Sequence, residues 1–117
     1  MTVGEAIARL DGRQYNDVPY AEKKSWLEEL ERMLAANVYS RYEAPGPVIA
    51  ALEPDTVLLA EGFDEMYLKW LEARVDLYNA EPERYNAAIA LFNAEYAVFE
   101  SRYNREHMPL AAGAFRF

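Results

Sequence analysis

Six aromatic or apolar residues repeat along the last third of the chain at alternating spacings of 4 and 3. They are Tyr85, Ile89, Phe92, Tyr96, Phe99 and Tyr103. Such a repeat places its members on one stripe of an α-helix, as in the seam of a coiled coil. The stripe predicts a helix that extends to about His107 and, at ~1.5 Å per residue, is more than about 30 Å long.

The preceding segment predicts a partner for this helix. Residues 64–80 place Met66, Trp70, Ala73 and Leu77 on one helical stripe, with Tyr67 and Tyr78 among the residues of a neighbouring stripe. So wide an apolar face indicates burial on more than one side. Residues 81–83 make a tight connection with a proline and two acids at a helix start, where the helix dipole favours them. The two segments are therefore predicted to form a long antiparallel α-hairpin.

Two further helices are predicted before the hairpin. Thr2 and Glu5 have the spacing of a capping box, and the short helix that they begin is expected to end at residues 11–12. After a loop, Pro19 begins a second helix that is expected to end near Tyr42, with Glu28 and Arg32 paired on its wet side. The fold class that follows is all-α, a small bundle of about four helices.

Residues 43–63 form a long middle loop, which we call the arm. Prolines at 45, 47 and 54 leave room for one helical turn at most, around residues 48–52. The apolar residues at 56–59 have the composition of a short strand, and its partner is either an adjacent subunit or nothing, with the residues then covering the bundle's core. Val57, Leu58 and Leu59 are accordingly interface candidates.

Composition allows one domain and limits its partners. The chain has 117 residues, no cysteine and a net charge of -8, shared evenly between its two halves. We expect a single helical domain over 1–109 and a flexible C-terminal tail over 110–117. The basic residues do not cluster enough to hold phosphate, and no secretory signal or apolar run of ~18 residues is present, so we expect a soluble protein with no membrane contact.

No pattern predicts catalysis, and we expect no enzyme, no cofactor and no metal. The single histidine, His107, lies at a predicted helix end, where a cation is favoured without any catalytic role. Neither Glu-x-x-His nor His-Glu-x-x-His occurs, although a metal site made only of carboxylates stays open. The paired acids are typical of solvated helix faces and caps.

The tyrosines carry more information. Nine Tyr and two Trp exceed what a modest core needs, and both residue types are enriched where an apolar ring is buried and its polar tip stays wet, as in subunit interfaces. A tyrosine-rich core is the alternative for any one of them. The core or subunit-contact candidates are Tyr67, Trp70, Tyr78, Tyr96 and Tyr103.

An ordered set of residues resembles a family of small tailed-phage and prophage proteins, the head–tail connectors (adaptor or head-completion proteins). The set includes TVGEAI at 2–7, DTVLL at 55–59, FDEMY at 63–67, WLE at 70–72 and YNREHMP at 103–109. The similarity covers residues 2–109. The chain departs from the family at Asn86-Ala87, where an Asn pair is common, and at residues 81–83, where the family has a more glycine-containing turn.

The resemblance implies a structural adaptor without an active site. It would dock on the portal protein of a filled capsid as a ring of about a dozen copies and meet a tail-side connector or tail-completion protein. DNA would pass through the channel without specific binding. Its place would be the head–tail junction of the virion, after assembly in the cytoplasm of the bacterial host, and the free protein could be monomeric.

Two other functions are weighed against this one. A small acidic helical regulator or inhibitor of a host protein would need its acids on one face, to which the even spread along the chain gives little support. A carboxylate-metal enzyme would need a bound metal such as iron or manganese.

Overall fold

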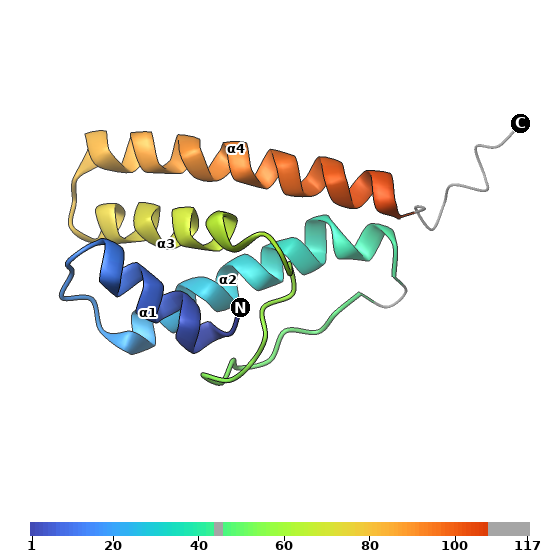
Figure 1. Cartoon of the computed structure of the whole chain (residues 1–117), viewed down its shortest axis with the longest axis horizontal. Helices are drawn as coiled ribbons and strands as arrows, with labels where there is room; N and C mark the ends of the chain where they lie inside the picture. The colour runs from blue at the N-terminus through green and yellow to red at the C-terminus, as the bar shows by residue number, and fades with distance from the viewer. Residues whose placement is uncertain (44–45, 108–117) are drawn as a thin grey trace, which may run out of the picture.

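The computed structural model describes residues 1–43 and 46–107. The helices of this part are α1 (Val3–Arg13), α2 (Tyr20–Asn37), the 3-10 helix η1 (Tyr39–Arg41), α3 (Asp64–Tyr78) and α4 (Pro82–Glu106). α3 lies in the middle, with α4 along one side of it and α1 and α2 on the other (Figure 1). The prediction of a small all-α bundle with a long hairpin is confirmed; the predicted tail, 110–117, lies outside the described residues.

α1 begins as predicted and ends later than predicted. The Thr2 hydroxyl accepts a hydrogen bond from the Glu5 backbone N–H at 3.1 Å, and the Glu5 carboxylate accepts one from the Thr2 N–H at 2.8 Å. Gly12 is an internal residue of the helix rather than its terminus, because the bond from the Gln14 N–H to the Leu10 carbonyl closes one more turn.

α2 ends at Asn37 rather than near Tyr42, and its expected Glu28–Arg32 pair is replaced by other contacts. The chain tightens into η1 where buried Tyr39 meets the rings of Phe99 and Tyr103 on α4, so tertiary packing sets this helix end. The Glu28 carboxylate accepts a hydrogen bond from the Leu52 N–H at 2.8 Å and lies 3.8 Å from the Lys24 ammonium.

The core lies between α1, α2 and α3. Its members include Leu10, Leu27, Leu30, Met66 and Leu71, none of which has exposed surface. α3 is buried on two sides, as its wide apolar face predicts. None of the helices in the described ranges is both long and apolar enough to span a bilayer.

α4 buries much less of itself. Only Phe92 and Phe99 are fully buried on it, while Ile89, Tyr96 and Tyr103 are half-buried. The reason is that its backbone has one helical neighbour, α3, with side-chain contacts to η1 and Phe63 near its C-terminal end. Among the described residues, no other element lies along the side of α4 that faces away from α3, and we call this side open (Figure 1).

The arm contains no helical turn over residues 46–63, which agrees with the limit of at most one turn that its prolines set. Its apolar segment pairs with the chain's own N-terminus, through an isolated antiparallel bridge between Thr2 and Val57. The Val3 N–H donates to the Thr56 carbonyl and the Leu58 N–H to the Met1 carbonyl, each at 2.9 Å. The suggested strand is thus a single bridge within one chain.

Candidate interaction surface

The groups that could carry chemistry are scattered. His107 stacks on the Tyr103 ring at 3.7 Å between centroids, and its Nδ1 lies 2.9 Å from the Tyr103 carbonyl oxygen. In the ranges 1–43 and 46–107, no three or more His, Asp or Glu side chains are grouped so as to hold a metal ion.

Two glutamates of α2 hold the arm against the bundle. Glu28 accepts the Leu52 N–H, and Glu31 accepts the Leu59 N–H, each at 2.8 Å. Both oxygens of Glu31 are used, because its other oxygen accepts a 2.5 Å hydrogen bond from the Tyr67 hydroxyl. These bonds fix two points of a segment that has no regular structure of its own.

The second glutamate lies in an unusual environment for a carboxylate. Glu31 is only 2% exposed, and this burial raises its pKa above the ordinary value, although the hydrogen bonds from Tyr67 and Leu59 act in the opposite direction. The Tyr67 oxygen also accepts a hydrogen bond from the Ala60 N–H at 2.9 Å. Burial, followed by the nearby Glu31 charge, raises the pKa of Tyr67, so the phenol stays protonated.

The sequence analysis did not predict that Glu31 binds the arm, although the position of this acid on α2 was a sign of it. Glu31 lies four residues after Leu27 and three before Leu34, both of which are buried, and so belongs to the apolar face of α2. An acid on such a face needs a hydrogen-bond donor. The donors come from residues 59 and 67, whose approach to α2 no local pattern in the sequence reveals.

The eight interface candidates have three different placements. Leu58, Tyr67 and Trp70 are buried in the core of this chain. Leu59, Tyr96 and Tyr103 are half-buried against that core, with one side of each reaching the surface. Val57 and Tyr78 are each 52% exposed and are the candidates most accessible to another protein.

These candidates do not form one patch. Val57 lies on the arm beside the N-terminus, whereas Tyr78 lies at the end of α3 and packs edge-on against Trp26. A third group surrounds Tyr103, whose ring centroid lies 4.8 Å from that of Tyr39 and 5.2 Å from that of Tyr42. The Tyr42 hydroxyl hydrogen-bonds the Asn104 side chain, which ties η1 to the end of α4.

The Tyr78 group includes a cation. The Arg74 guanidinium lies 5.7 Å from the Trp26 ring centroid and 5.2 Å from that of Trp70. The Trp70 indole N–H donates to the Trp26 carbonyl at 2.8 Å, and Arg74 pairs with Glu29 at 3.0 Å. The two tryptophans are thus held within this chain by a hydrogen bond and by the Arg74 cation that lies over both rings.

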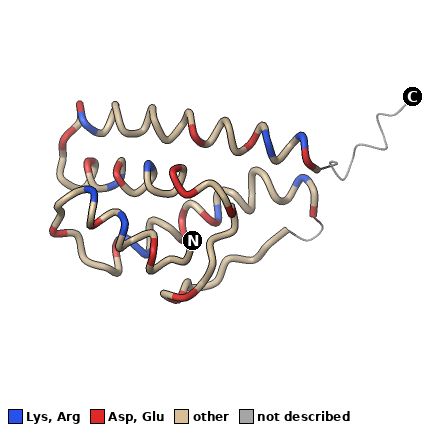
Figure 2. The backbone as a smooth tube through the Cα atoms, in the orientation of Figure 1, with Lys and Arg blue, Asp and Glu red and all other residues tan. Residues whose placement is uncertain are grey.

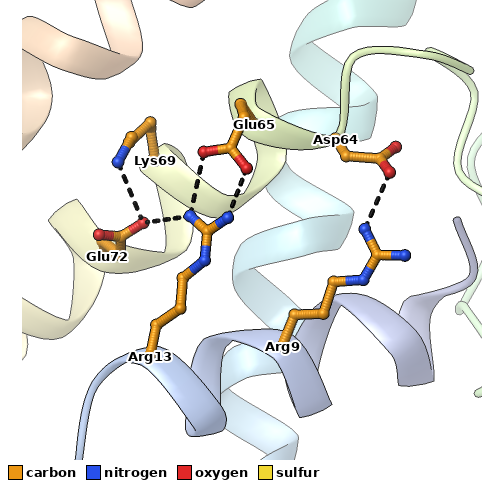
Figure 3. A network of polar contacts seen from close by, with 6 residues as sticks. All are labelled: Arg9, Arg13, Asp64, Glu65, Lys69 and Glu72. Atoms are coloured by element: carbon orange, nitrogen blue, oxygen red, sulfur yellow. Dashed lines mark hydrogen bonds and ion pairs between the residues drawn. The ribbon is translucent and has the colours of Figure 1, made fainter.

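The face between α1 and α3 is occupied by ion pairs (Figure 3). Arg13 meets Glu65 at 2.5 Å and Glu72 at 3.4 Å, and its hydrogen bond lowers the pKa of Glu65. The other contacts are Arg9–Asp64 at 2.9 Å and Lys69–Glu72 at 3.7 Å. Acids and bases neutralise each other here, so this face is not a concentrated acidic surface.

Comparison with known proteins gave no match to a family model, to a curated protein or to a solved structure.

Proposed function

We propose that the protein is a structural component of a tailed phage or prophage, a head–tail connector that docks on the portal protein and extends the DNA channel towards the tail. About a dozen copies form its ring in the virion, where it also meets a tail-side connector or tail-completion protein. Assembly takes place in the cytoplasm of the bacterial host. The proposal begins from the ordered set of residues between 2 and 109 described above.

The structural observation that carries the proposal is the arm. Its inner side chains, Leu52, Leu58 and Ala60, are buried, whereas Val48 is 89% and Val57 is 52% exposed. Apolar side chains presented by an extended segment are typical of a docking element. The two α2 glutamates and the bridge to Thr2 hold this segment in place before a partner arrives.

The charge of the chain is consistent with a channel component. Asp and Glu are interspersed with Lys and Arg along the elements, and no basic stripe is seen in the described part of the chain (Figure 2). A net charge of -8 on each copy would make a ring strongly electronegative. Such a ring repels phosphate and so favours passage of DNA over its retention.

Portal binding tests the proposal directly. The protein is co-expressed with the portal protein encoded in the same phage or prophage genome, and the complex is examined by electron microscopy and native mass spectrometry. We expect a ring of this protein on the portal. A Val57→Asp variant should lose that binding, because it places a charge on the outer side of the arm.

The matched control is Tyr15→Asp in the loop between α1 and α2, where the replaced tyrosine is 86% exposed. This variant should still bind the portal. Binding that is absent for the wild type, or that both variants weaken equally, contradicts the proposed role of the arm. The alternative of an acidic regulator gains no support from the α1–α3 face, since its carboxylates are paired with Arg9, Arg13 and Lys69.

A further inference from the structure

The open side of α4 carries an uninterrupted run of uncharged side chains. At ~100° per residue, residues 87, 90, 91, 94, 97, 98 and 101 all lie within ~60° of the direction of residue 94, which points away from buried Phe92 and Phe99. These are Ala87, Ala90, Leu91, Ala94, Ala97, Val98 and Ser101, and all seven are exposed. We call this run the α4 outer face.

Two large apolar side chains of this face are exposed to solvent and could be buried by a partner. Leu91 is 54% and Val98 is 57% exposed, and both border the same side of a centre line of small residues. Small side chains on the centre line let a second helix approach closely, while larger ones beside it supply the buried area. The run extends for about 21 Å from Ala87 to Ser101 at ~1.5 Å per residue.

The charges at the two ends of the α4 outer face indicate which partner binds it. Glu83 lies on the same side of the helix eleven residues before Ala94, and Arg105 lies eleven residues after it. If two copies of α4 pack antiparallel about Ala94, Glu83 of each copy falls at the height of Arg105 of the other. The same register sets Ala87 beside Ser101 and brings Leu91 and Val98 of the two copies together. Antiparallel packing also sets the two helix dipoles in opposition, which favours it.

From this self-complementarity we infer that the α4 outer face is a contact between two copies of this chain, related by a two-fold axis at Ala94. The pairing is isologous, so each ion pair and each Leu91–Val98 contact occurs twice. One helix face is smaller than the ~800 Å² per partner of a standard interface, and the dimer therefore belongs to the weak, concentration-dependent class. The inference does not rest on the proposed connector function.

Sedimentation velocity and small-angle scattering between 5 µM and 1 mM protein, on the order of the range in which weak dimers form, test the contact. We expect a monomer at the low end and a dimer at the high end. Ala94→Glu places two carboxylates at the two-fold axis and should raise the dissociation constant at least about tenfold, a change of ~1.4 kcal/mol. Asn93→Glu is the matched control, because residue 93 is also exposed but lies ~100° around the helix.

Charge reversal tests the orientation of the two helices. Glu83→Arg and Arg105→Glu, each alone, oppose like charges at both ends and should weaken the dimer about threefold or more. The double variant E83R/R105E restores opposite charges only in the antiparallel register and should recover wild-type affinity. Circular dichroism establishes that each variant is folded. A wild-type protein that stays monomeric to 1 mM, equal loss in A94E and N93E, or no recovery in the double variant overturns the inference.

Discussion

Glu31 places a carboxylate in the core where two donors, the Leu59 N–H and the Tyr67 hydroxyl, meet it. Its charge costs free energy because water is excluded, yet it is also the acceptor that keeps the arm on α2. Removing the acceptor would leave a buried donor without a partner, at a cost of about 1–3 kcal/mol. The side chain thus stabilises the position of the arm more than the fold as a whole.

The pH dependence of stability follows from the direction of the pKa shift. Burial raises the pKa of Glu31 in the folded protein above its unfolded value of ~4.3. Between those two values the folded state binds more protons than the unfolded state, so the free energy of unfolding falls as pH rises through this window. A Glu31→Gln variant cannot titrate there. We expect its free energy of unfolding, relative to wild type, to increase from pH 4 upwards and then level off above the raised pKa.

Urea unfolding of both proteins at several pH values measures this difference. Carboxyl groups whose pKa is lowered, such as Glu65 and Asp11, have the opposite pH dependence but are common to both proteins and cancel. A difference that is constant with pH, or that changes in favour of wild type as pH rises, contradicts the assigned burial cost.

At the scale of elements, the α3–α4 connection holds a non-glycine residue in a left-handed conformation. Ala80 has φ 55°, and the bonds from the Glu81 N–H to the Asp76 carbonyl and from the Ala80 N–H to the Leu77 carbonyl form a Schellman motif around it. A left-handed alanine costs ~1–2 kcal/mol, which glycine avoids. We therefore expect Ala80→Gly to raise the free energy of unfolding by about 1 kcal/mol.

Urea midpoints of wild type and variant check this expectation. The control is Ala97→Gly, which replaces an exposed alanine in the interior of α4 and should lower stability by about 1 kcal/mol. Both substitutions replace alanine by glycine, but the expected changes in the free energy of unfolding have opposite signs. Equal destabilisation by both would show that the turn does not hold the strain assigned to Ala80.

The elements also differ in how far the sequence could predict them. The hairpin was predictable because its signals are local: periodic aromatics at 92, 96 and 99, and a proline that begins α4. The path of the arm was not, because Val57 pairs with Thr2, 55 residues earlier in the chain, and the arm's side of each contact is a backbone group, which any residue carries. The end of α2 was misplaced for a similar reason, since Tyr39 turns to meet rings on α4.

At the scale of the whole molecule, the sequence indicated that tyrosine and tryptophan would matter for packing or contact, but not which of these residues lie in the core and which at the surface. The tyrosine and tryptophan excess divides between the core, where Tyr67 and Trp70 lie, and the surface, where Tyr78 is half exposed. Composition cannot make that division, because one amphipathic side chain suits both environments. The open side of α4 follows from the order of the layers. α3 packs against α4 on one side and against α1 and α2 on the other, whereas α4 packs against α3 on one side.

The charge of the whole molecule leads to a prediction about DNA. Each copy carries -8, and its basic side chains are largely engaged in ion pairs with acids, as on the α1–α3 face. Because residues 1–43 and 46–107 present no free basic stripe, they offer no cluster of Lys and Arg that could neutralise DNA phosphates and release their counterions, which is the main source of affinity for DNA. We expect no binding of a fluorescent 30-base-pair duplex, about three helical turns, at ~0.15 M salt in anisotropy measurements up to about 100 µM protein.

The same anisotropy measurement on the portal-bound ring, with the portal alone as reference, distinguishes DNA binding by the free chain from DNA binding by the assembled ring. The ring should add no affinity for duplex DNA, because repeating an acidic copy around an axis deepens the negative potential that phosphate meets. Micromolar binding that weakens as salt is raised would mean that folding or assembly creates a cationic surface. That outcome would contradict a channel that lets DNA pass without holding it.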